Sequence, residues 1–207
     1  LANARGNKKW VIDADIKGAF DNIDHDFLLE LIEKFPARGL IKQWLKAGYV
    51  EKSITHPTNS GTPQGGIISP LLANIALHGM EKAIGVKRDN RYRLIGERAI
   101  VRYADDFVVF CRTKTDAEEV IQILTEWLKV RGLSFSKEKT KIVHMREGFD
   151  FLGFNIRLYT VNNSKTGYRL LITPSKEAEI KIRNKLREEW NSLRGQSPEI
   201  IFIQLNP

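Results

Sequence analysis

The 207-residue sequence contains a single cysteine, Cys111, and only four histidines, which lie far apart. One cysteine excludes both an intrachain disulfide and a thiolate zinc site, and the histidines lack the spacing of metal ligands. The chain also lacks an apolar run of the roughly 18 residues that a membrane span requires, and no signal peptide is visible in it. We therefore expect an intracellular protein in a reducing compartment, with no membrane partner.

Acidic residues are outnumbered, since 33 lysines and arginines face 25 aspartates and glutamates, for a net charge of +8. An excess of positive charge favours an anionic partner, with nucleic acid as the first candidate. Apolar residues make up 42% of the chain, which is typical of a folded protein with a core. The length allows one domain, or one domain and part of a second.

Short strands and amphipathic helices alternate along the chain without a regular βαβ spacing. Strands are expected at 10–15, on both sides of Asp105 and Asp106, and at 139–145, 149–158 and 168–173. Helices are expected after caps at Asp24, Ser69, Thr115 and Ser175, and from Pro36. We expect the helix over 70–85 to be continuous and buried. The pattern favours an α+β fold with an antiparallel sheet and helices packed on one face, of the ferredoxin-like palm type.

Asp105 and Asp106 interrupt an apolar stretch, "YRLIGERAIVRYADDFVVF", that otherwise predicts two strands joined by a turn. Adjacent carboxylates near a core are costly unless a cation lies between them. A solvated Asp-Asp hairpin turn is the other interpretation, and such turns are common. This stretch alone leaves both interpretations open.

A second pair of carboxylates, Asp13 and Asp15, lies at alternating positions of the first strand, so both face the same side. If Asp105 faces that side too, three or four carboxylates converge. Such oxygen-only sites suit Mg²⁺, and two ions about 3.5–4 Å apart can stabilise both oxygens of an in-line phosphoryl displacement. The alternative is that Asp13 lies at the surface and Asp15 caps a local turn.

Five segments resemble reverse transcriptases. Tyr103-Ala104-Asp105-Asp106, the YADD motif, is similar to their signature, and "DIKGAFDNIDH" (15–25) to their first catalytic motif. "GTPQGGIISPLLANIAL" (61–77) resembles their substrate-binding loop and helix. "GLSFSKEKTKIVH" (132–144) and "FDFLGF" (149–154) resemble the motifs that close the palm. The order and wording are most similar to group II intron-encoded proteins, the bacterial and organellar maturases, over residues 8–158.

The resemblance implies an RNA-directed DNA polymerase of a group II intron, acting in intron mobility and assisting splicing. Its cofactor would be two Mg²⁺ ions, with Mn²⁺ as a substitute. Its partners would be an RNA template, a DNA primer, deoxynucleoside triphosphates and intron RNA, in a bacterial cytoplasm or an organelle. The alternatives are a retron or other bacterial reverse transcriptase, or a non-catalytic RNA-binding splicing cofactor.

The resemblance also implies roles for individual carboxylates. Asp15 and Asp105 would be the catalytic metal ligands, Asp106 a supporting carboxylate, and the Ile16 carbonyl an additional ligand. Asp13 has no role in the family's motif, and a structural position is the better interpretation for it.

Five residues would form the nucleotide site: Phe20, Gln64, Gly65, Gly66 and Lys139. The ring of Phe20 would lie under the sugar and exclude a 2′-hydroxyl by steric clash, or it is an ordinary core residue. The glycines would let backbone approach a base pair. Lys139 would approach the triphosphate, or it is one more solvated lysine.

The remaining implications concern the borders of the palm. Phe151, Leu152 and Gly153 would support the primer end, or simply form a packed strand pair. We expect a palm over 1–158 without the family's N-terminal finger motifs. Residues 159–207 would form a connection and the start of the thumb or maturase region. The 207-residue chain alone is accordingly expected to extend a primer weakly or not at all.

Overall fold

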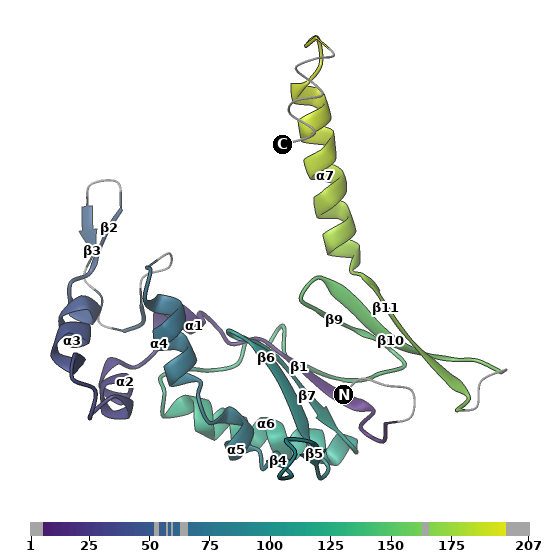
Figure 1. Cartoon of the computed structure of the whole chain (residues 1–207), viewed down its shortest axis with the longest axis horizontal. Helices are drawn as coiled ribbons and strands as arrows, with labels where there is room; N and C mark the ends of the chain where they lie inside the picture. Colours follow the sequence, from purple (N-terminus) through teal and green to yellow (C-terminus); the bar gives the residue numbers. More distant parts are fainter. Residues whose placement is uncertain are drawn as a thin grey trace.

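A four-stranded antiparallel sheet forms the centre of the computed structural model, which describes residues 6–51, 54–56, 58, 60–62, 66–162 and 166–197. Its order is β6-β7-β1-β8, from β1 (Trp10–Ala14), β6 (Ala99–Tyr103), β7 (Asp106–Cys111) and β8 (Lys141–His144) (Figure 1). Helices fill the connections from β1 to β6 and from β7 to β8, which gives the ferredoxin-like βαββαβ arrangement. The prediction of an α+β palm is confirmed.

A helical layer covers one face of this sheet. Helix α6 (Lys114–Lys129) packs on β1, β7 and β8, and α5 (Met80–Ala83) packs on α6. The other helices lie to the side (Figure 1): α1 (Ala19–Asn22) and α2 (His25–Leu31) pack against α4 (Ser69–Ala76), and α3 (Arg38–Lys46) packs against α2. Alternate residues of β1 and β7, including Ile12, Phe107 and Val109, form one buried cluster with Leu72 of α4 and Leu124 of α6. Burial of these side chains removes apolar surface from water, at roughly 25 cal/mol per Å². The period-two alternation of β1 therefore directs Asp13 and Asp15 to the opposite face.

A three-stranded antiparallel sheet lies over part of that opposite face. It contains β9 (Phe149–Phe151), β10 (Phe154–Thr160) and β11 (Tyr168–Pro174), in the order β11-β10-β9. Val11, Val108 and Phe110 of the central sheet form a second buried cluster with Phe149 and Leu158. The helices thus occupy one face, as predicted, while a small sheet covers part of the other.

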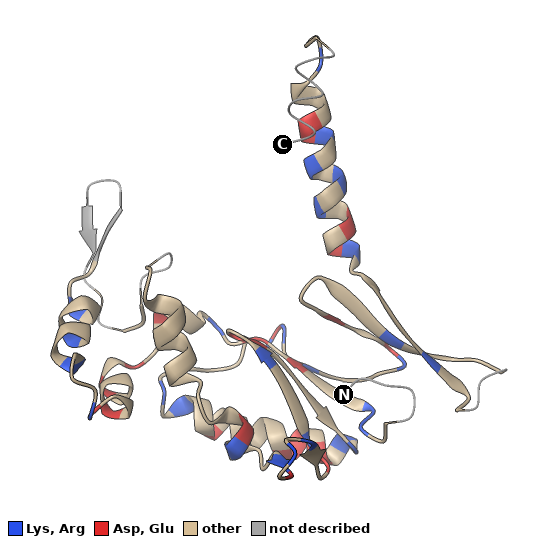
Figure 2. Cartoon of the chain, in the orientation of Figure 1, with Lys and Arg blue, Asp and Glu red and all other residues tan. Residues whose placement is uncertain are grey.

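Helix α7 (Lys176–Ser192) follows β11 and projects away from both sheets (Figure 1). Every residue along it is exposed or partly exposed, and its lysines and arginines gather in the middle of the helix, with glutamates toward both ends (Figure 2). Two short hairpins complete the fold: β2 (Tyr49–Glu51) with β3 (Ile54–His56), and β4 (Lys87–Arg88) with β5 (Leu94–Ile95). Within the described ranges, no helix is both long enough and apolar enough to cross a membrane.

Of the four predicted caps, Asp24 and Ser175 are right, whereas Ser69 and Thr115 are wrong. Ser69 is the first residue of α4, and Ile68 occupies the cap position. Asp24 accepts a hydrogen bond from the Phe27 N–H at 2.7 Å, and Ser175 caps α7 in the same way. For α6 the cap is Thr113, which accepts from the Asp116 N–H at 3.1 Å, whereas Thr115 lies inside the first turn. The chain leaves β7 at Cys111, so the helix starts sooner than the sequence pattern indicated.

The helix predicted over 70–85 is also wrong as a continuous element. It divides into α4 and α5, with Gly79 between them at a φ of 89°. A left-handed residue cannot continue an α-helix, so the axis changes direction there. Leu71 remains 58% exposed, so α4 is buried on one side and not all round.

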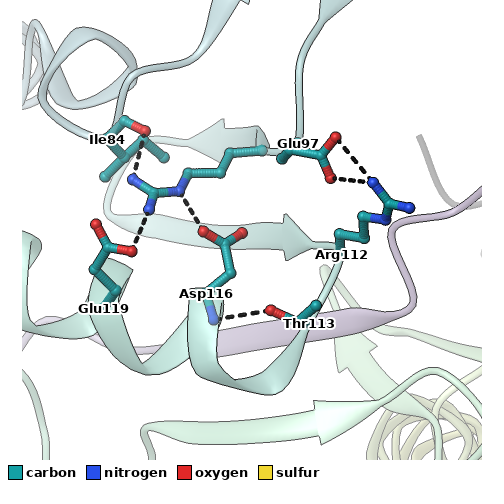
Figure 3. Close-up of polar contacts among 7 residues, drawn as sticks. Ile84, Glu97, Arg112, Thr113, Asp116 and Glu119 are labelled. Atoms are coloured by element: carbon teal, nitrogen blue, oxygen red, sulfur yellow. Dashed lines mark hydrogen bonds and ion pairs between the residues drawn. The ribbon is translucent and has the colours of Figure 1, made fainter.

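An ion-pair cluster fastens α6 to the sheet beside β6 (Figure 3). Arg98 donates to Asp116 at 2.7 Å, pairs with Glu119 at 2.9 Å and donates to the Ile84 carbonyl at 3.2 Å.

Burial, reinforced by Asp116, raises the pKa of the Cys111 thiol to about 12. A thiol with so high a pKa is unreactive, so Cys111 is a core residue.

Candidate active site

Strand pairing brings the acidic ends of β1 and β7 together. Ala14 pairs with Phe107 in the antiparallel register, so Asp15 and Asp106 lie at the same edge of the sheet. A cavity of about 350 Å³ lies at this edge. Among the described residues, its lining includes Asp13, Asp15, Asp106, Lys139, Asp150, Phe151, Leu152 and Glu177. Asp105 is outside this set, because it occupies the turn that precedes β7. The fold thus gathers carboxylates separated by about 90 residues of sequence.

The carboxylates of this cavity influence one another. Partial burial, followed by repulsion from Asp105 and Asp15, raises the pKa of Asp106. Burial raises the pKa of Asp13 to about 6, with repulsion from Asp150, Asp106 and Asp15 acting against attraction from Lys141. Like charges in a shared site favour protonation or a bound cation. Asp13 therefore interacts electrostatically with the other carboxylates of this site, although the family's motif gives it no role.

Lys139 forms an ion pair with Asp15, whereas the sequence predicted either a contact with the triphosphate or a solvated lysine. Its Nζ lies 3.4 Å from Oδ2 of Asp15, in a partly exposed ion pair. The segment that carries it is held against the end of β1, because the Ser136 N–H donates to the Asp15 carbonyl at 2.8 Å. Ile16 and Phe135 form an isolated antiparallel bridge. The bonds of this bridge use the Asp15 carbonyl and the Lys17 N–H, so the Ile16 carbonyl is not one of its acceptors.

The β6–β7 hairpin that carries Asp105 has a strained turn. Tyr103 pairs with Asp106, which leaves Ala104 and Asp105 as its two central residues. Ala104 has a φ of 55°, a conformation that usually requires glycine. A two-residue hairpin with positive φ at the first central residue alone matches the type II′ class. Left-handed backbone at a non-glycine residue costs about 1–3 kcal/mol, so surrounding contacts must hold this turn.

The hairpin between β9 and β10 places a second tight turn beside the cavity. Phe151 pairs with Phe154, and the central residues Leu152 and Gly153 have φ values of 49° and 80°. Positive φ at both positions is typical of a type I′ turn. Phe151 and Leu152 line the cavity, whereas the Gly153 carbonyl accepts from the Ser175 N–H at the start of α7. The strand predicted over 149–158 is therefore wrong as a continuous element, because this turn divides it into β9 and β10. The role of Phe151, Leu152 and Gly153 toward a primer stays a prediction.

Phe20 is half-buried and packs against the main core. Its carbonyl accepts from the Thr62 N–H at 2.5 Å, and the Gly61 N–H donates to the Ile23 carbonyl at 2.7 Å. Gly61 has a φ of 74°, and a Cβ there would lie 2.3 Å from the backbone carbon of Asp21. These contacts join the start of the loop "GTPQGG" to the segment that carries Phe20. Both interpretations of Phe20 therefore remain consistent with its surroundings.

The other members of the predicted nucleotide site are placed unequally. Gln64 and Gly65 lie outside the described residues. The Gly66 carbonyl accepts from the Ser69 N–H at 3.1 Å, at the start of α4. Sequence reasoning missed Asp150 and Glu177, which reach the cavity from β9 and α7. Their sequence neighbourhoods carry no signal for this. Packing of β9 on the central sheet brings Asp150 near β1, and the hydrogen bond from the Ser175 N–H to the Gly153 carbonyl holds the start of α7, with Glu177, beside it.

The donor set fits a hard divalent cation. Within the described ranges, no group of three or more His, Cys, Asp or Glu side chains could hold a metal ion by itself. Mg²⁺ does not require such a cage, since it is commonly held by one or two carboxylates while substrate phosphates and water complete the shell. Asp15 and Asp106 supply oxygen donors from adjacent strands, which is the chemistry that this mode of binding needs.

Comparison with known proteins agrees with this geometry. The family model described as reverse transcriptase (RNA-dependent DNA polymerase) matches residues 1–156. The group II intron-encoded protein LtrA of Lactococcus lactis subsp. cremoris is 31% identical, over 88% of this chain and 41% of LtrA. The chain therefore spans about two fifths of that relative's length.

Solved structures share the fold. A telomerase from Candida albicans superposes with a TM-score of 0.55 and 15% identity, over 72% of this chain and 29% of that chain. A foamy viral protease-reverse transcriptase in complex with an RNA/DNA hybrid gives a TM-score of 0.52 and 20% identity, over 86% and 19% of the two chains.

Proposed function

Because the chain belongs to the reverse transcriptase family, we propose that it forms the palm of an RNA-directed DNA polymerase of the group II intron type. The predicted likeness to group II intron-encoded proteins is confirmed by the relative LtrA. The observation that carries the proposal is the meeting of Asp15 and Asp106 at one cavity, from the adjacent strands β1 and β7. The activity would be deoxynucleotidyl transfer to a DNA primer on an RNA template.

Asp15, Asp105 and Asp106 would hold the Mg²⁺ ions, with the Ile16 carbonyl as a further donor and Mn²⁺ as a substitute. Bound ions of this kind stabilise the attacking and leaving oxygens of an in-line displacement. The chain's own part is to hold these carboxylates in place. The hydrogen bond from Ser136 to the Asp15 carbonyl and the pairing of β1 with β7 do this.

Two side chains would act directly on the nucleotide. The Lys139 ammonium, which is paired with the Asp15 carboxylate at the cavity, would neutralise phosphate oxygens of the incoming triphosphate. The Phe20 ring would lie under the sugar, where it leaves no room for a 2′-hydroxyl. Gln64, Gly65 and Gly66 would shape the pocket around the base pair.

Nucleic acid is the proposed partner, in the form of an RNA template, a DNA primer and intron RNA. The net charge of +8 supports this, together with the basic residues on the exposed surface of α7. Phe151, Leu152 and Gly153 would support the primer end beside the cavity. Binding that depends on phosphates should weaken steeply with salt, because counterions are released.

The proposal is tested by primer extension with the full-length protein. We expect Asp15→Asn and Asp105→Asn each to reduce extension roughly a hundredfold or more, because each removes charge that stabilises the reaction. Asp26→Asn, at an exposed position in the first turn of α2, is the control and should leave the rate unchanged. Near-normal extension by either active-site variant would refute the assignment. Intron RNA binding and splicing by a wild-type protein that never extends a primer would instead show a splicing cofactor.

A further inference from the structure

Arg102 is the residue of β6 that precedes the YADD turn by one position, and none of the roles described above involves it. One nitrogen of its guanidinium, Nη1, donates to two acceptors, each at 2.8 Å. One acceptor is the Ala104 carbonyl in the turn that carries Asp105, and the other is Oδ1 of Asn74 on helix α4. Nη1 carries two hydrogens, so each acceptor can receive one.

We propose that Arg102 is a positioning residue, which clamps the turn that carries Asp105 and ties it to helix α4. This inference rests on the proposed function, because it assigns a role within the same site. It adds a contact between the proposed metal-binding turn and the helix that follows the proposed nucleotide loop.

The first half of the clamp acts on a planar peptide unit that can flip by rotation about the backbone bonds on either side of it. The Ala104 carbonyl belongs to the peptide unit that joins Ala104 to Asp105. Type I′ and type II′ turns share positive φ at the first central residue and differ by a flip of this peptide. Ala104 has a φ of 55°, whereas Asp105 is not among the residues with positive φ. A hydrogen bond from a charged donor, worth about 1.5–3 kcal/mol, opposes the flip and so fixes where the Asp105 side chain leaves the backbone.

The second half of the clamp reaches a rigid helix. Leu72, Ala73 and Ala76 are buried and hold α4 in the main core. Asn74 lies on the exposed side of the same helix, where its amide oxygen can accept from Arg102. The hydrogen bond between the Gly66 carbonyl and the Ser69 N–H joins the start of α4 to the end of the "GTPQGG" loop. A contact made at Gly66 is therefore linked, through α4 and Arg102, to the turn that carries Asp105.

A purely electrostatic role is the competing explanation, in which Arg102 only offsets the negative charge of the aspartates. Arg102→Lys separates the two, because lysine keeps the charge but its chain ends one bond before the position of Nη1, the atom that donates to both acceptors. Asn74→Ala tests the clamp from the other side without changing any charge. Alanine is the most favourable residue in a helix, so this variant should fold.

The experiment measures single-nucleotide extension by the full-length protein, with kcat and the KM for deoxynucleotide determined separately. We expect kcat to fall about 10–100-fold in Arg102→Ala and Arg102→Lys, since small misplacements of reacting groups cost up to about a hundredfold. The KM should change less than about threefold. Asn74→Ala should lower kcat several-fold, and the double variant should be no slower than Arg102→Ala, because both changes remove one shared contact.

Amide hydrogen exchange of residues 103–106 gives a readout that does not depend on activity. Exchange should become faster in Arg102→Ala and Asn74→Ala while the melting temperature changes little. Arg112→Ala is the matched control, because Arg112 follows the other end of β7 in an exposed pair with Glu97 and should keep wild-type kcat and exchange.

Two results would overturn the clamp: wild-type kcat in Arg102→Lys, or fully additive losses in the double variant. A wild-type protein that fails to extend any primer would refute the proposed function instead. In that case the exchange rates of the turn alone would decide for or against the clamp.

Discussion

Replacing Asp13 by asparagine should stabilise the folded protein at neutral and alkaline pH. Asp13 lies on β1 beside Asp15, and burial is the largest cause that raises its pKa from 3.8 to about 6. Repulsion from Asp150, Asp106 and Asp15 acts in the same direction. Asparagine has nearly the same shape and carries no charge, so the substitution removes the repulsion and the cost of burying the charge.

The sign of the pH dependence follows from proton binding. Between pH 3.8 and about 6 the folded state holds a proton on Asp13 that the unfolded state has lost. Stability from this group is therefore complete below pH 3.8, falls as the pH rises, and reaches its minimum above about 6. A pKa change of this size sets a ceiling of roughly 3 kcal/mol. Because Asp13 is partly exposed, solvent screening reduces the expected gain for Asp13→Asn to about 1–2 kcal/mol.

Urea unfolding at pH 4 and pH 8, in a chelating buffer that removes divalent ions, measures this difference. The variant should exceed the wild type by about 1–2 kcal/mol at pH 8 and by much less at pH 4. Glu33→Gln, at an exposed position, is the control and should stay within about 0.5 kcal/mol of the wild type at both pH values. An equal effect of Asp13→Asn at both pH values, or a loss of stability at pH 8, would refute the reasoning.

Three further predictions concern other parts of the palm. Phe20→Val should increase ribonucleotide over deoxynucleotide incorporation in primer extension, whereas an unchanged ratio with lowered stability would identify a core residue. Gly61→Ala should destabilise the fold by about 3 kcal/mol in urea unfolding, because the new Cβ would collide with the backbone of Asp21 and φ is positive. Gly39→Ala should instead stabilise it by about 0.5–1 kcal/mol, because a Cβ at this position of α3 would meet open space. Arg98→Met should cost about 2–3 kcal/mol by leaving the largely buried Asp116 carboxylate unpaired, whereas Arg112→Ala at an exposed pair should cost under about 0.5 kcal/mol. Equal losses in these two variants would contradict this.

The local sequence patterns already determined much of the palm. The alternation of β1, the apolar flanks of Asp105 and Asp106, and the side-chain caps at Asp24 and Ser175 each depend on neighbours within a few residues. Short-range signals of this kind predict elements well, because period and capping chemistry are local. The break of the 70–85 helix at Gly79 was the main local error, since apolar residues continue across it.

Tertiary structure alone decided which charged groups meet. Strand register placed Asp15 next to Asp106, packing of the small sheet brought Asp150 into the same cavity, and the Ser136 bond placed Lys139 beside Asp15. The hydrogen bond from Arg102 to Asn74 likewise joins residues that are 28 positions apart. Such contacts depend on strand order and on packing between distant segments, which no local period encodes. The sequence by itself determined which residues could do the chemistry, and the fold determined which of them lie close enough to act together.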